Sequence, residues 1–129
     1  MANPNIVSVA TINGVNLGWN LTNTLTTSLL TVTAEYVIKI NRIVCANVHS
    51  SAAANLNLYV TKLNTTPAGV TNFDVSGDFY LAKVISVPYQ SSLVVLDTPI
   101  YLNETDVLKG GASASSALDL LISYEALID

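Results

Sequence analysis

Short runs in which apolar and polar residues alternate, separated by turn residues, constrain the fold of this chain more than any other feature of its sequence. Successive side chains of a β-strand point to opposite faces of the sheet, so a two-residue apolar period predicts half-buried strands. These runs are rich in Val, Ile, Thr and Tyr, which favour strands because they pack well on a pleated surface. No segment keeps helical spacing over three turns. We therefore expect an all-β protein.

Two segments carry the alternation most clearly. The apolar positions expected to share one face of the first segment are Tyr36, Ile38, Ile40, Val44, Ala46 and Val48. Arg42 interrupts this face, which predicts a bulge or bend close to it. The second segment is a regular final strand, with alternating residues Leu118, Leu120, Ile122 and Tyr124.

The remaining pattern predicts about eight short strands in one domain, and hence a β-sandwich or a jelly-roll-like fold. Residues 64–78 are expected to form a loop, and Gly110–Gly111 with Ala112–Ala117 are expected to form a connection of small residues. Asn13–Gly14 predicts a hairpin turn, because both residues tolerate positive φ.

The segment up to residue 34 contains no charged side chain, the first being Glu35. Such a segment is poorly suited to standing alone in water. We therefore expect residues 1–34 to form an N-terminal arm or hairpin that contributes to assembly contacts, and residues 35–129 to form the sandwich body. The alternative is an ordinary buried hairpin of the same domain.

The composition indicates a surface that partners cover. Charged residues make up 11% of the chain, whereas an average soluble domain has about 25%. No apolar run of about 18 residues or more predicts a membrane span, and no secretory signal is visible. The net charge is −4 and the five cations are scattered. Direct binding of nucleic acid is therefore not expected, because it needs a basic patch.

The sequence predicts no enzyme and no catalytic, cofactor-binding or metal-binding residues. A triad or a His-rich metal site would have to use His49, the one histidine. Its neighbours place it at a junction of strand and turn, where a solvated or hydrogen-bonded histidine is expected. Cys45 has no partner for an internal disulfide, and its apolar neighbours predict a small buried thiol.

Two acidic pairs are expected to be structural. Asp74 and Asp78 flank Gly77 and would offer two carboxylates to Ca²⁺, but the full ligand pattern of an EF-hand is missing. A polar loop is the preferred interpretation. Glu104 and Asp106 are expected to solvate a tight turn between strands.

The aromatic residues leave one alternative function open. Tyr59 and Tyr80 lie on predicted strands, opposite the faces expected to point inward, so both are predicted to be exposed. Exposed aromatic rings stack on sugars or anchor protein interfaces. Tyrosines that fill the core of a sandwich, with the hydroxyl at its edge, are the other interpretation.

Several segments resemble small virion proteins of cyanophages and related tailed phages, in the same order along nearly the whole chain. The similar segments are Met1–Val7, Val37–Asn41 with Ala46–Val48, Tyr80–Lys83 through Leu93–Leu102, and Ile122–Glu125. The turn Pro88–Gln90 and the Gly-Gly step after Lys109 depart from the resemblance. The shared segments are strand and turn patterns, so the resemblance brings no catalytic residues.

The resemblance implies a virion structural protein, foremost a capsid decoration (cement) protein that bridges neighbouring capsomers and stabilises the head. The expected partners are the chain itself, as a homo-oligomer and most simply a homotrimer, and the major capsid protein. The expected location is the outer surface of the capsid. A neck, tail or fibre accessory protein and a carbohydrate-binding host-adhesion module are the alternatives.

Overall fold

The computed structural model describes residues 11–65 and 75–128, which form strands joined by turns and no helix. None of these residues therefore belongs to a helix that would cross a membrane. The strands are β1 (Thr11–Asn20), β2 (Ser28–Thr31), β3 (Tyr36–Asn47), β4 (Ala54–Thr65), β5 (Val75–Val87), β6 (Ser92–Leu96), β7 (Ile100–Leu102), β8 (Val107–Ala112) and β9 (Leu118–Ile128). The expected all-β class is confirmed.

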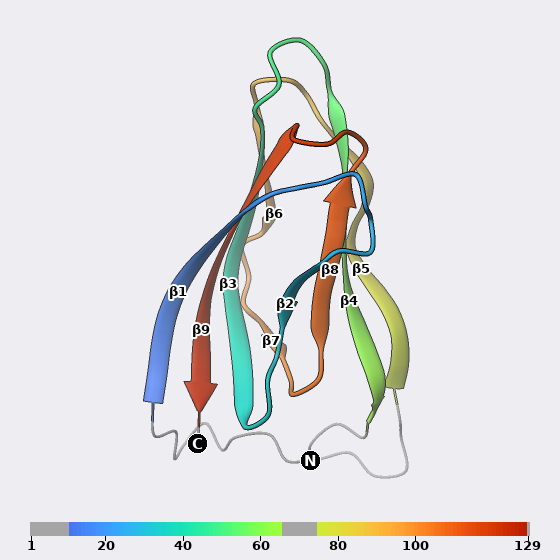
Figure 1. Cartoon of the computed structure of the whole chain (residues 1–129). Coiled ribbons are helices and arrows are strands. Elements are labelled where there is room, and N and C mark those ends of the chain that lie inside the picture. The colour runs from blue at the N-terminus through green and yellow to red at the C-terminus, as the bar shows by residue number, and fades with distance from the viewer. Residues whose placement is uncertain (1–10, 66–74, 129) are drawn as a thin grey trace.

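The strands form two antiparallel sheets that face each other (Figure 1). One sheet has the order β1-β9-β3-β6, with β7 also paired to β3, and the other has the order β2-β8-β4-β5. The pairing is nested: β1 meets β9, β2 meets β8, β3 meets β6 and β7, and β4 meets β5. Because β6 and β7 share one side of β3, each sheet has four strand positions. This is the arrangement of a jelly-roll sandwich.

A bulge in β3 decides which of its residues reach the core. Its register with β9 shifts between Ile40 and Arg42, so the bulge predicted near Arg42 is confirmed. The extra residue reverses the inward face, because side chains alternate along a strand. Ile40 is buried before the bulge, and Ile43 and Cys45 are buried after it.

The face predicted for the second half of this segment is therefore wrong. Val44 and Ala46 alternate with the buried residues and are half-buried on the outer side of the sheet. Val48 lies beyond the end of β3 and is exposed. By contrast, the regular strand predicted at residues 118–124 is confirmed, with Leu118, Leu120 and Ile122 buried.

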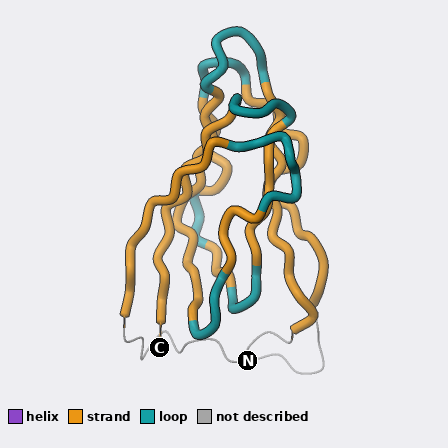
Figure 2. The backbone as a smooth tube through the Cα atoms, viewed as in Figure 1, coloured by secondary structure: helices purple, strands orange, loops and turns teal. Residues whose placement is uncertain are grey.

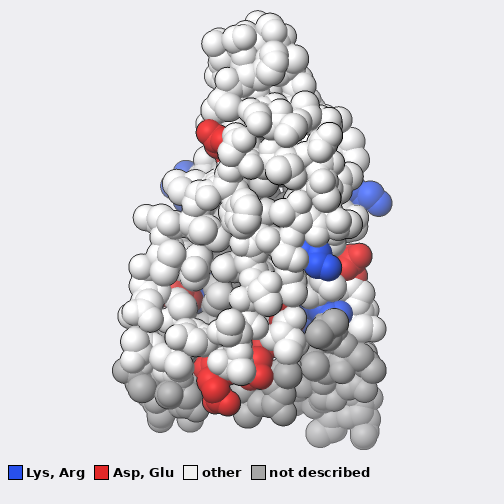
Figure 3. All heavy atoms as spheres, viewed as in Figure 1, with Lys and Arg blue, Asp and Glu red and all other residues white. Residues whose placement is uncertain are grey.

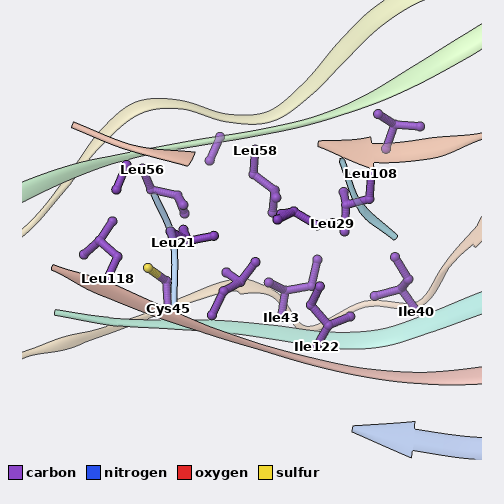
Figure 4. Packing of buried hydrophobic residues seen from close by; sticks show 14 of the residues in the cluster. Leu21, Leu29, Ile40, Ile43, Cys45, Leu56, Leu58, Leu108, Leu118 and Ile122 are labelled. Atoms are coloured by element: carbon purple, nitrogen blue, oxygen red, sulfur yellow. The ribbon is translucent and has the colours of Figure 1, made fainter. Parts of the chain in front are cut away.

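The core fills the space between the two sheets (Figure 4). One sheet contributes the buried apolar residues of β3 and β9, and the other contributes Leu56, Leu58 and Leu108. Leu21 and Leu29, from the connection between the first two strands and from β2, complete the same cluster. Residues from both ends of the chain therefore depend on one core.

The N-terminal segment belongs to this sandwich from residue 11 onward. The strand β1 pairs with β9 along its whole length and passes straight through Asn13 and Gly14, which face Ala126 and Glu125. The hairpin turn predicted there is wrong: neither residue has positive φ, because pairing with β9 fixes an extended backbone.

The expected boundary at residue 34 does not separate two packing units, since β1 and β2 are strands of the two sheets. Residues 1–10 of the expected arm lie outside the described residues. That segment 1–34 contributes to contacts between subunits stays a prediction. The expected loop 64–78 is shorter at both ends, because β4 runs to Thr65 and β5 begins at Val75.

The expected small-residue connection begins later than predicted, because Gly110 and Gly111 are part of β8. A Cβ atom at Gly110 would overlap the backbone carbonyl oxygen of Asn57 on the neighbouring strand. A Cβ atom at Gly111 would lie 2.7 Å from the carbonyl oxygen of Thr24. The two glycines are therefore required by close packing against backbone, and not by a turn.

We predict that Gly110→Ala lowers the free energy of unfolding by about 1–3 kcal/mol, because the backbone of β4 must move to admit the methyl group. Gly14→Ala is the matched control, since a Cβ there meets nothing within 4 Å. It should leave stability unchanged or raise it by about 0.5–1 kcal/mol. Urea unfolding of both variants measures the difference, and equal stability of the two would contradict this packing.

Candidate interaction surface

Four loops gather at one end of the sandwich, at the top of Figure 2. They join β1 to β2 (residues 21–27), β3 to β4 (48–53), β5 to β6 (88–91) and β8 to β9 (113–117). These loops contain no Lys, Arg, Asp or Glu, and the tip of the molecule is uncoloured on the face that Figure 3 shows. We call these four loops the neutral loop end.

Apolar side chains are exposed on the neutral loop end. Val48 is 54% exposed and Tyr89 is 53% exposed, and Leu25 lies on the loop that follows β1 at 43%. The rest of these loops is mostly Ser, Thr, Ala and Asn. A surface of this kind loses little hydration energy when a partner covers it, because no charge has to leave water.

A buried asparagine at the end of β3 anchors the β3–β4 loop. Asn47 is 2% exposed, and its side-chain amide donates to the carbonyl oxygens of Ala52 (3.0 Å) and Val87 (2.9 Å). Its Oδ1 atom accepts the backbone N–H of His49 at 2.9 Å. Because Val87 ends β5, this single side chain ties the β3–β4 loop to the opposite sheet. The sequence gives one usable signal for it, an Asn at the end of a buried strand.

His49 caps the same loop. Its Nδ1 atom accepts the backbone N–H groups of Ser51 and Ala52, both at 3.1 Å. The predicted hydrogen-bonded histidine at a strand-to-turn junction is confirmed. In the neutral imidazole, this pattern places the proton on Nε2. The side chain therefore holds the loop in place.

Backbone hydrogen bonds connect the loops to one another. The Ser116 N–H donates to the carbonyl oxygen of Leu21 (3.1 Å), and the Val48 N–H donates to that of Ala117 (2.9 Å). The Asn47 N–H donates to the carbonyl oxygen of Ser91 (2.8 Å). Loops from distant parts of the chain are thus cross-bonded, which presents their exposed side chains on a preformed surface.

The opposite end of the sandwich carries acidic residues. Asp106 is 1% exposed there, and its Oδ2 atom accepts from Lys62 Nζ at 2.7 Å and from the Asn103 N–H at 2.9 Å. The prediction that Asp106 solvates its turn is wrong, since the carboxylate is buried and paired. Glu104, by contrast, accepts the backbone N–H of Glu35 at 3.3 Å in an exposed position.

The described residues hold no cluster of three or more His, Cys, Asp or Glu that would suit a metal ion. Asp74, one carboxylate of the calcium alternative, lies outside the described residues. The other, Asp78, accepts the Thr61 hydroxyl at 2.7 Å.

Cys45 is fully buried among the core residues of β3, as expected from its apolar neighbours. Burial raises the pKa of its thiol from 9.0 to about 11, and the negative charge of Asp119 adds to the effect. The protonated thiol is therefore the form that the fold stabilises, and it is a poor nucleophile.

We predict a loss of stability at high pH that depends on Cys45. Because its pKa is higher in the folded state than in the unfolded state, its contribution is complete below pH 9 and is lost as the pH rises through about 11. Urea unfolding between these pH values should give a steeper decline for the natural protein than for Cys45→Ala. Parallel declines would contradict the assigned burial.

The two tyrosines predicted to be exposed differ. Tyr80 is exposed, whereas Tyr59 is 5% exposed, so the prediction for Tyr59 is wrong. Their ring centroids lie 4.9 Å apart with planes tilted by 35°, and Lys83 Nζ lies 5.0 Å from the centre of the Tyr80 ring. Burial raises the pKa of Tyr59, and Asp78 and Tyr80 contribute. The pair therefore presents one exposed ring, without a coplanar second one.

A shallow groove of about 340 Å3 lies along the pair β1–β9. Its lining includes Gly18, Trp19, Asn20, Asp119 and Leu121. The Asn20 side-chain amide donates to Asp119 at 2.7 Å, and the Trp19 indole N–H donates to the carbonyl oxygen of Leu29 at 3.1 Å. Trp19 thus uses its polar atom to join the two sheets.

Comparisons with known proteins show only distant likenesses. No family model matches the chain, and no curated protein matches its sequence. Among solved structures, the chain is similar to a protein of the disulfide-linked pili of Bacillus endospore appendages, with 11% identity over 92% of this chain and 87% of that one, at a TM-score of 0.41. It is also similar to part of a chain of infectious bursal disease virus, Gt strain, with 11% identity over 93% of this chain and 32% of the viral one, at a TM-score of 0.32.

Proposed function

We propose that the protein is a structural subunit of a virus particle, which works through contacts made by many copies and not through catalysis. The neutral loop end carries this proposal. The cores of protein interfaces are depleted of charged residues and enriched in tyrosine, and this end combines uncharged loops with the exposed side chains of Val48 and Tyr89.

The fold is compatible with this role. Jelly rolls recur in viral capsid domains and in lectins, and one fold serves many functions. The rigid cross-bonding of the loops supports a contact role, because a preformed surface loses less conformational entropy on binding.

The finer proposal is a decoration protein on the outer head of a tailed phage. The neutral loop end would contact the major capsid protein and bridge neighbouring capsomers. The resemblance of the sequence to small phage virion proteins supports this placement, together with the low charge of the whole chain. The alternative is an accessory protein of the neck, tail or fibres.

A carbohydrate-binding adhesion module is less well supported. Stacking on sugars favours exposed aromatic rings, but Tyr59 is buried beside Tyr80 and Trp19 donates its indole N–H within the protein.

Quantitative mass spectrometry of purified virions tests the proposal. Copies of this chain should match copies of the major capsid protein at a ratio of roughly one to one, because decoration follows the symmetry of the shell. A ratio lower by about an order of magnitude would contradict decoration of the head and favour the neck, tail or fibres. Complete absence of the chain from virions would contradict the virion role altogether.

A further inference from the structure

Among the sheet edges of the described residues, the outer edge of β1 is the one that is long, regular and free of charged residues. We propose that this edge pairs with β1 of a second copy, antiparallel and about a two-fold axis, so that two sheets join into one. The inference rests on the proposed role as a multi-copy subunit and names the surface through which two copies meet.

The strand β1 is long and lacks the features that protect sheet edges. It is ten residues long, and its register with β9 runs without a shift from Thr11 to Asn20. It contains no charged residue and no proline. Natural edges are usually short, bulged, or marked by Lys or Pro, because a regular edge offers its free N–H and C=O groups to another chain.

The two edges of the other sheet are protected. The edge strand β2 has four residues, and its register with β8 is interrupted between Ser28 and Leu30. The edge strand β5 carries Asp78 and Lys83, its register with β4 shifts three times, and Val84 has a φ of 53°. Neither edge offers a straight row of backbone groups.

The far edge of the sheet that contains β1 is also interrupted. It consists of β6 and β7, with five and three residues. Asp97 and Pro99 lie between them. Within residues 11–65 and 75–128, β1 therefore forms the one long, uncharged and regular edge.

The alternation of antiparallel pairing identifies the free backbone groups. The Leu21 N–H donates to the carbonyl oxygen of Leu118 across the β1–β9 pair at 2.9 Å. Since hydrogen-bonded and outward-facing positions alternate, the even-numbered residues of β1 direct their N–H and C=O groups away from β9. Two of these residues are Gly14 and Gly18, where a Cβ would meet nothing within 4 Å, so no side chain screens the backbone.

The sequence of β1 suits pairing with itself. About a two-fold axis, the residue on the axis meets its own counterpart, and the residues on either side of it meet each other in reciprocal pairs. A strand with charges of one sign would therefore repel itself. With Asn16 on the axis, the glycines Gly14 and Gly18 face each other. The same register sets Val15 opposite Leu17, whose side chains are both half-buried, and pairing would bury both further.

The mass of the isolated chain tests this pairing. We expect twice the chain mass of 13.7 kDa, measured by light scattering on a sizing column over a dilution series. Asn16→Lys should give the single-chain mass, because it sets two like charges near the axis. Ser92→Lys, on β6 at the far edge of the same sheet, makes the same charge change at an exposed strand residue and should leave the doubled mass unchanged.

Three outcomes would overturn the pairing. The first is a single-chain mass for the natural protein, which would fit an edge covered by the chain's own residues 1–10. The others are an oligomer that Asn16→Lys leaves intact and a trimer. If Asn16→Lys fails to fold, amide hydrogen exchange of the natural protein replaces it. The amides of Gly14 and Gly18 should then be protected at high concentration and exchange faster on dilution, and concentration-independent exchange would overturn the proposal.

These measurements use the isolated chain, whereas the virion role is tested by copy number in particles. A monomer that is abundant in virions would overturn the pairing alone. A dimer that is absent from virions would overturn the proposed function alone. Because the pairing is two-fold, it is an alternative to the homotrimer expected from the sequence.

Discussion

The position of β9 between β1 and β3 is the constraint on which the rest of the structure depends. Its residues pair with β1 along ten positions and with β3 along eleven, so the last strand of the chain joins two segments from its first half. Its inward residues Leu118, Leu120 and Ile122 close the core against the opposite sheet. This placement leaves the outer side of β1 at the edge, and it brings the loop before β9 beside the three other loops of the neutral end.

Charge is distributed unevenly over this frame. The acidic turns lie at one end, where Asp106 is held by Lys62 and by a backbone amide, and the other end has four loops without a charged side chain. A buried carboxylate with a paired cation is stable only when its partners are fixed. The ion pair at the acidic end therefore has a structural role. The neutral end exposes apolar side chains on loops that Asn47 and His49 hold in place, and it is suited to contact.

The sequence was sufficient to predict local features and insufficient for those set by distant pairing. Alternation in residues 118–124 predicted β9, and Arg42 predicted the bulge in β3, because both signals are local. The predicted inward face after the bulge was wrong, because one extra residue reverses the alternation of side chains between the two faces. The turn predicted at Asn13–Gly14 was wrong, because pairing with β9 imposes an extended backbone there. Burial of Asp106 and Tyr59 depends on partners far along the chain, and the neutral loop end arises only when the topology gathers four loops.

The most direct test of the central claim is whether a charge on the neutral loop end prevents binding to the particle. Tyr89→Glu adds a charge there, and Tyr101→Glu adds the same charge to β7 at a tyrosine of nearly equal exposure, 49% against 53%. Co-sedimentation with particles stripped of this chain should show much weaker binding of Tyr89→Glu and normal binding of Tyr101→Glu. Equal binding of the two folded variants would contradict the assignment of the neutral loop end as the contact surface.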